Sequence, residues 1–251
     1  MNKRLGSLGE AQRLNRAHRA GRVPNLVVGL LDRLHGEGLD KHFTVVGTHA
    51  LYAYEASAGV RIMPSAMQRK TSTCPGAPVR VSFITDLAKM EEKSILRILQ
   101  RVDPTFQRKD MHNETAINAR GFEVDFLRRE QQQDGPHPWR FSADEDDLWP
   151  VQAHRASILT DAPRFAAPVI AANGAMAMMH TISPTSFVKF KTWLATQAPG
   201  RQNIKKARDQ HQAEIVQQML DERILFEQRV PSLTAEQRVE ESERKRAANP
   251  S

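Results

Sequence analysis

The chain has only one cysteine, Cys74, among its 251 residues. A single cysteine cannot form an intramolecular disulfide or a cysteine-based zinc cluster, so the sequence predicts a reducing, cytoplasmic compartment. Long apolar runs are also missing, since the longest early run, residues 26–31, is too short to cross a bilayer. The basic first residues continue into charged ones, which does not fit a signal peptide. We expect a soluble protein without a membrane partner.

Acidic residues are missing from one long segment, because neither Asp nor Glu occurs from residue 56 to residue 85. The chain as a whole is basic, with a formal net charge of +7, and 40% of its residues are hydrophobic. That hydrophobic content is enough for a core in one large or two small domains. The positive charge favours acidic partners such as nucleotides or nucleic acid, although basic proteins also occur without either partner.

A strand, a tight turn and a helix are predicted at residues 42–58. The β-branched and aromatic run at residues 43–46 ends at Gly47 and Thr48, and helix-forming residues follow. Because glycine lacks a Cβ atom, the backbone can turn sharply there and expose amide groups to a phosphate at the start of a helix. The alternative is that the turn only connects the strand to the helix.

A second strand, at residues 121–129, places Asp125 between two apolar neighbours. Burying a carboxylate in an apolar strand is unfavourable unless it pairs with a cation or binds a metal. The alternative is an aspartate at the edge of a sheet that faces water, with Arg128 or Arg129 as its partner.

Further patterns extend the prediction over the chain. Apolar residues at three- and four-residue spacing predict helices at residues 7–20, 24–35 and 89–102, and alternation predicts strands at 79–84 and within 115–128. From residue 144 onward the pattern is interpreted as helical throughout. The helices expected there cover residues 148–159, 168–179, 187–196 and 203–226.

Four blocks of sequence together resemble a bacterial family of nucleotidyltransferase-fold proteins in the polymerase-beta-like superfamily. They lie at residues 45–55, 121–129, 145–152 and 179–184. The resemblance implies an α+β fold in which a small mixed sheet of nucleotidyltransferase type is flanked by helices and followed by a mostly α-helical C-terminal domain. It also implies transfer of a nucleotidyl group from an NTP to a hydroxyl or phosphate acceptor with the help of Mg²⁺.

The resemblance and the predicted elements together divide the chain into four parts. We expect N-terminal helices at residues 1–36, a nucleotidyltransferase-like α/β domain at 37–140, a helical domain at 141–230, and a polar tail at 231–251 that is either a frayed helix or disordered.

The family pattern assigns roles to three residues of this chain. Gly47 and Thr48 match the turn that contacts the phosphates, and Asp125 matches the third acid of the superfamily, a catalytic metal ligand. Glu123 lies two residues before Asp125, and alternate strand residues point to the same face, so Glu123 is a second metal-ligand candidate.

Two lysines are additional candidates for nucleotide binding. Lys189 and Lys191 lie on one predicted helix and could meet a triphosphate. The alternative is a solvated basic face, which is the usual role of lysines on helices.

The family's Asp-x-Asp pair is absent. Thr71 and Thr73 occupy the expected positions, and two hydroxyl groups cannot replace two carboxylates, because Mg²⁺ prefers charged oxygen ligands. The resemblance therefore implies a protein whose two-metal site is incomplete and whose catalysis is impaired.

Residues 68–78 suggest a cause for this loss, because they are small, polar or turn-forming and show no periodicity. Read one base earlier, with codons favoured in a GC-rich gene, the segment encodes Ala-Thr-Glu-Asp-Val-Asp-Leu. One hypothesis is a frameshifted stretch bounded by compensating changes. The other is a diverged loop in a non-catalytic relative. The nucleotide sequence distinguishes them.

Three functions stay open at this point. The first is an impaired nucleotidyltransferase whose acceptor is an RNA, a nucleotide or a protein. The second is a non-catalytic member of the same fold that binds a nucleotide or a partner protein. The third is a nucleic-acid-binding module that uses the basic helical half of the chain.

Overall fold

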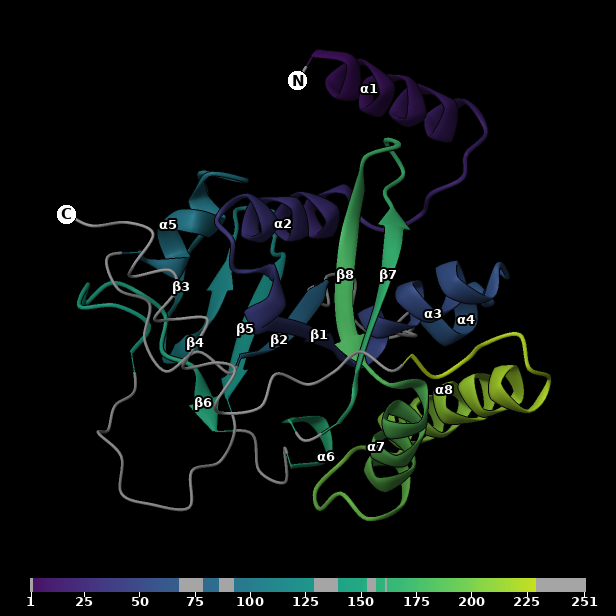
Figure 1. The fold of residues 1–251 in the computed structure, drawn as a ribbon. Coiled ribbons are helices and arrows are strands. Elements are labelled where there is room, and N and C mark those ends of the chain that lie inside the picture. Colours follow the sequence, from purple (N-terminus) through teal and green to yellow (C-terminus); the bar gives the residue numbers. More distant parts are fainter. Residues whose placement is uncertain are drawn as a thin grey trace, which may run out of the picture.

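A mixed sheet of eight strands forms the centre of the molecule in the computed structural model (Figure 1). The structure describes residues 2–67, 79–85, 93–128, 140–152, 157–160 and 162–228. The strand order is β3-β4-β5-β2-β1-β8-β7, and β6 pairs with β5. The strands are β1 (Phe43–Val46), β2 (Arg80–Thr85), β3 (Gln107–Lys109), β4 (His112–Ile117), β5 (Glu123–Arg128), β6 (Val151–Gln152), β7 (Arg164–Ile170) and β8 (Met176–Ile182).

Helices flank this sheet, which confirms the mixed α+β fold with a C-terminal helix pair. The helices are α1 (Asn2–Ala17), α2 (Asn25–Gly36), α3 (Leu51–Ala58), α4 (Pro64–Met67), α5 (Ile95–Gln100), α6 (Ser157–Thr160), α7 (Pro184–Thr196) and α8 (Asn203–Asp221), with short 3₁₀ helices η1 (Asp40–His42) and η2 (Gly47–Ala50). No helix in these ranges combines the length and the apolar character needed to cross a bilayer. The segment with Thr71 and Thr73 lies outside the described residues, as does the predicted tail.

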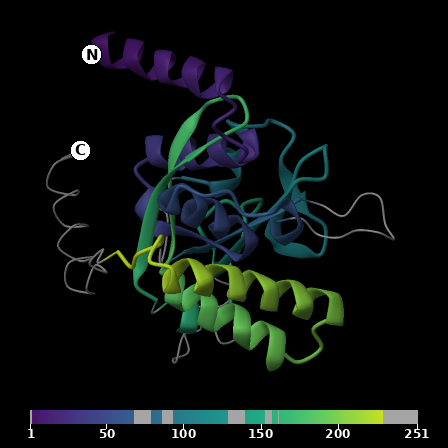
Figure 2. The same ribbon diagram turned by 90° about the vertical axis from the view of Figure 1, so that its right-hand side faces the viewer.

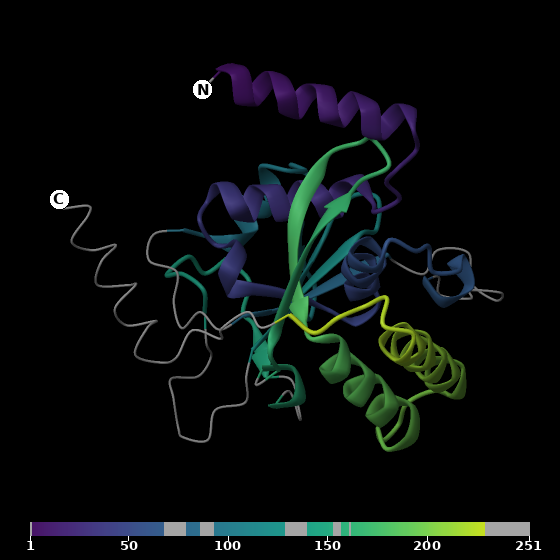
Figure 3. The same ribbon diagram turned by 45° about the vertical axis from the view of Figure 1, so that its right-hand side comes forward.

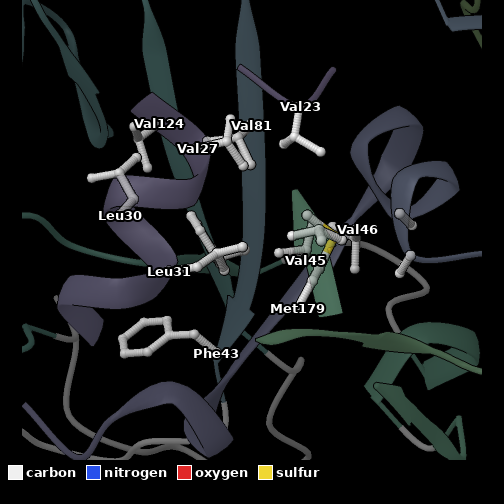
Figure 4. Close-up of a cluster of buried hydrophobic side chains, with 14 of the residues drawn as sticks. Val23, Val27, Leu30, Leu31, Phe43, Val45, Val46, Val81, Val124 and Met179 are labelled. Carbon is white, nitrogen blue, oxygen red and sulfur yellow. The ribbon is translucent and has the colours of Figure 1, made fainter. Parts of the chain in front are cut away.

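Helix α2 covers one face of the sheet. Its apolar residues recur at three- and four-residue spacing, so Val27 and Leu31 lie on the same side and are buried. Figure 4 shows them beside Val45 of β1, Val81 of β2 and Val124 of β5. Burying each leucine in such a layer stabilises the fold by about 1.5–3 kcal/mol. Because successive residues of a strand point to opposite faces, the residues that alternate with these three valines point away from α2.

The C-terminal helices α7 and α8 pack against each other and meet the sheet through α3 (Figure 2). The ring of Tyr54 on α3 lies 5.4 Å from that of Phe165 on β7 and 5.3 Å from that of Phe187 on α7. The Tyr54 hydroxyl donates a hydrogen bond of 2.7 Å to the Ile182 carbonyl at the end of β8. Tyr54 thereby joins the sheet to the helix pair.

The β7–β8 hairpin extends from the sheet toward α1, which lies at its tip (Figure 3). Asn15 of α1 donates a hydrogen bond of 3.3 Å from its side chain to the Gly174 carbonyl in the hairpin turn. Gly174 has a φ of 86°, and a Cβ atom there would lie 2.2 Å from the Gln12 carbonyl oxygen. The close approach of α1 to the hairpin therefore requires glycine at this position.

The helices predicted at residues 148–159 and 168–179 are wrong. Residues 164–182 form the antiparallel pair β7 and β8, and the first range contains only β6 and the four-residue helix α6 among its described residues. The apolar run fits a buried strand as well as a helix, and the Asn173-Gly174 turn between the two strands is the signal that decides it. The helix predicted at 187–196 is confirmed within α7, and the helix predicted at 203–226 is confirmed as α8, which ends earlier, at Asp221. The division into domains stays a prediction.

Candidate functional site

The turn after β1 depends on Gly47. Its φ of +76° is in the left-handed region, where a residue with a Cβ atom is strained. The chain leaves the strand at Val46, forms one turn of 3₁₀ helix and continues as α3. The predicted strand, turn and helix are thus confirmed as local structure, and the start of η2 and α3 lies at the carboxyl end of β1.

Thr48 is held by the last helix of the chain. The Gln212 side-chain amide of α8 donates a hydrogen bond of 3.2 Å to the Thr48 hydroxyl and a second of 2.7 Å to the Ala66 carbonyl. Gln212 is fully buried, and its Oε1 atom has no hydrogen-bond partner among the described residues. Gln212 of α8 therefore holds the turn in place, although it lies 164 positions after Thr48 in the chain.

Asp125 lies two strands away from this turn. The register pairs Val46 with Ser82 and Ser82 with Asp125, and on the other side of β5 it pairs Asp125 with Thr115. These residues form one row across β1, β2, β5 and β4. Since Val124 contacts the α2 layer, Asp125 points to the opposite face of the sheet.

The Asp125 carboxylate is surrounded by donors. The Thr115 hydroxyl donates a hydrogen bond of 2.8 Å to Oδ1, and the Ser82 hydroxyl donates one of 3.3 Å to Oδ2. The Arg80 guanidinium lies 3.3 Å from Oδ2. Burial raises the pKa of Asp125, and Arg80 and the two hydroxyls oppose that shift only in part. The carboxyl group is therefore easier to protonate than an exposed aspartate.

Glu123 is buried and binds two cations. Arg80 donates from Nε to its Oε2 atom at 2.7 Å, with a further contact from Nη2, and Lys109 of β3 donates to Oε1 at 2.5 Å. Burial by itself would raise the pKa of Glu123, but the hydrogen bonds and charges of Lys109 and Arg80 outweigh burial and lower it. Glu123 is thus an anion at neutral pH with both oxygens engaged.

The arrangement does not fit a divalent metal pair. In the described part of the chain, no group of three or more His, Cys, Asp or Glu side chains could hold a metal ion. The oxygens of Glu123 and Asp125 already accept from Arg80, Lys109 and two hydroxyls, whereas Mg²⁺ requires oxygen ligands free to coordinate it. The roles of Asp125 and Glu123 as metal ligands stay predictions.

The two lysines of α7 differ in environment. Lys189 is exposed, whereas Lys191 is buried and donates a hydrogen bond of 2.8 Å to Asp209 of α8. Arg201 binds the other oxygen of Asp209, at 2.5 Å from its Nε atom. Burial lowers the pKa of Lys191 to about 8, although Asp209 partly offsets that shift. Lys191 thus connects α7 to α8 through Asp209. The nucleotide-binding role of both lysines stays a prediction.

Several residues of this site are not identified by any motif in the sequence. Arg80, rather than Arg128, pairs with Asp125, since alternation along β5 turns Arg128 to the other face. Arg129 lies outside the described residues. Arg80 could have been suggested only by aligning the predicted strands at residues 79–84 and 121–129 in parallel. The other site residues that the sequence did not identify are Ser82, Lys109, Thr115 and Gln212.

The turn, the sheet and the C-terminal helices all fall within one family match. A family model described as Nucleotidyltransferase matches residues 25–233, which is most of the chain. No curated protein and no solved structure matches it. Because this match starts at α2 and extends beyond α8, the chain belongs to the nucleotidyltransferase family.

Proposed function

We propose that this protein binds an NTP at the Gly47-Thr48 turn and that its nucleotidyl transfer is impaired. The observation that carries the proposal is the left-handed Gly47 at the carboxyl end of β1, in the same sheet as Asp125. Backbone amides at the start of η2 and α3 suit a phosphate, because the first amides of a helix lack carbonyl partners within it. Family membership supports an NTP as the ligand.

The impairment follows from the acids that this chain lacks. Neither Asp nor Glu occurs between residues 56 and 85, and the two carboxylates on β5 are occupied by Arg80 and Lys109. Nucleotidyl transfer needs charge neutralisation on the triphosphate while an acceptor oxygen attacks. The acceptor would be a hydroxyl or phosphate group on an RNA, a nucleotide or a protein.

A binding experiment tests the nucleotide site. Fluorescence anisotropy with a labelled NTP should give saturable binding to the wild-type protein, and Thr48→Glu should weaken it at least about tenfold through like-charge repulsion with the phosphates. Thr192→Glu, an exposed position on α7, is the matched control and should bind as the wild type does. Wild-type protein that fails to bind NTP, or equal affinities in both variants, would refute the site.

Turnover is measured separately. With labelled NTP, Mg²⁺ and a mixture of RNA and protein acceptors, we expect no incorporation above a protein-free control. Protein-dependent incorporation would contradict the impairment while leaving the binding site intact. Sequencing the gene across codons 60–82 then shows whether a shifted frame encodes the Asp-x-Asp pair.

A further inference from the structure

One guanidinium group lies between the two carboxylates of β5. Arg80 binds Glu123 through Nε at 2.7 Å and through Nη2, and its Nη1 atom is 3.3 Å from Asp125 Oδ2. The parallel register of β2 and β5 places Arg80 opposite Glu123 and Ser82 opposite Asp125. A single cation therefore bridges two carboxylates on one face of the sheet, as a divalent metal would.

The local charges already balance. Glu123 and Asp125 as ionised carboxylates supply two negative charges, and Arg80 and Lys109 supply two positive ones. A divalent cation at Asp125 would have to displace Arg80 or lie close to it, and like charges at such separations repel each other. The four side chains thus disfavour a metal ion for an electrostatic reason.

The exposure of the four side chains shows which of them can move. The Glu123 and Asp125 side chains are 2% and 10% exposed, whereas those of Arg80 and Lys109 are 36% and 31% exposed. The carboxylates are fixed in the sheet, and Asp125 is further oriented by the Thr115 hydroxyl. Such hydrogen bonds to a carboxylate commonly support a metal ligand. Removing Arg80 should therefore expose a preformed anionic position.

We infer that Arg80 is a resident cation that takes the place of a divalent metal ion between Glu123 and Asp125. The carboxylate pair binds a divalent cation only when the Arg80 charge is removed. This inference concerns metal affinity, whereas the proposed function concerns nucleotide binding, so the two can fail separately.

Mn²⁺ binding in the absence of nucleotide tests the inference, with free Mn²⁺ followed by electron paramagnetic resonance. Arg80→Met should bind Mn²⁺ at least about tenfold more tightly than the wild type, since it keeps the aliphatic stem and removes the charge. Arg80→Lys keeps a positive charge and should bind weakly, as the wild type does. The matched control is Arg97→Met, an exposed residue paired with Asp144, which should also leave affinity unchanged.

Asp125→Asn in the Arg80→Met background locates the gained site and should remove the gain. The inference is overturned if Arg80→Met binds Mn²⁺ no better than the wild type, or if the gain survives Asp125→Asn. Thermal unfolding establishes that each variant is folded. If Arg80→Met does not fold, the wild type still provides a test, because Asp125→Asn alone should leave Mn²⁺ affinity unchanged. A loss of affinity in that single variant would overturn the inference.

Discussion

Asp103 illustrates how a single side chain joins separate parts of the chain. Its carboxylate accepts from the Thr105 amide and hydroxyl at 3.0 and 2.7 Å, from the Asn118 side chain at 2.9 Å and from Arg120 at 3.1 Å. The hydrogen bonds from Thr105 hold the pKa of Asp103 well below its usual value of 3.8, against the opposing effect of burial. Asp103 thus fixes the segment after α5 to the β4–β5 turn.

Asp103→Asn should lower the free energy of unfolding by about 1–2 kcal/mol at neutral pH. Because the folded-state pKa is depressed, the stabilisation by Asp103 is fully present above about pH 4 and is lost as pH falls below that value. Urea unfolding of both proteins at several pH values measures it. The difference between wild type and variant should shrink below pH 4, and a difference constant down to pH 2.5 would contradict this account.

Gly47 gives a second prediction at the residue scale. A Cβ atom at this position would meet nothing within 4 Å, so Gly47→Ala suffers only from the left-handed backbone and should lower the free energy of unfolding by about 1–2 kcal/mol. Gly36→Ala is the matched control, because it is also unobstructed but is the last residue of α2, where the backbone is not left-handed and alanine is not disfavoured. Urea midpoints that shift in the same direction for both variants would contradict the explanation.

Between helices, a buried ion pair joins α7 to α8. Asp209 is fully buried and binds Lys191 from α7 and Arg201 from the connection between the helices. Gln212 lies one turn later on α8 and holds Thr48 at the candidate site. The ion pair therefore links the packing of the helix pair to the position of the turn.

Asp209→Asn should lower the free energy of unfolding by about 3–5 kcal/mol, because Lys191 and Arg201 would both lose the buried carboxylate that balances their charge. Replacing both residues, with Lys191→Met and Asp209→Leu, should cost less than the single change. Asp221→Asn at the exposed end of α8 is the control and should alter stability by less than about 0.5 kcal/mol. Chemical denaturation measures all four proteins. A single variant as stable as the control would show that the ion pair contributes little.

Across the whole molecule, the sheet and the C-terminal helices share one core. Strand β8 of the β7–β8 hairpin pairs with β1 in parallel. Helix α7 starts almost immediately after β8. Tyr54 contacts β7 and α7 and donates to the end of β8. These contacts couple the N-terminal half of the chain to the C-terminal half.

We expect the sheet and the helix pair to unfold together. Far-UV circular dichroism and tryptophan fluorescence, which includes Trp193 on α7, should give the same urea midpoint. Tyr54→Ala removes both ring contacts and should lower both midpoints equally. Two separate transitions, or a variant that shifts only the fluorescence, would instead support an independent helical domain after residue 140.

The sequence determined the parts of the structure that depend on neighbouring residues. Alternation of apolar and polar residues predicts β2 and β5, and apolar residues at three- and four-residue spacing predict α2 and α8. The turn at Gly47 follows from the absence of a Cβ atom in glycine. It also predicts the family, because separate blocks resemble the same pattern and the family model matches residues 25–233. The β7–β8 hairpin was missed because an apolar run satisfies both periods, and only the Asn173-Gly174 turn distinguishes them.

Only the tertiary structure decided which charges meet. Asp147 is more than 50 positions from α5 in the sequence, yet it accepts from the amides of Ile95 and Leu96 at the start of that helix. Arg80 and Glu123 are 43 positions apart and meet because β2 and β5 are parallel and in register. Strand order and register arise from burial across the whole sheet, so local pattern could place Asp125 on a strand but could not identify the cation beside it.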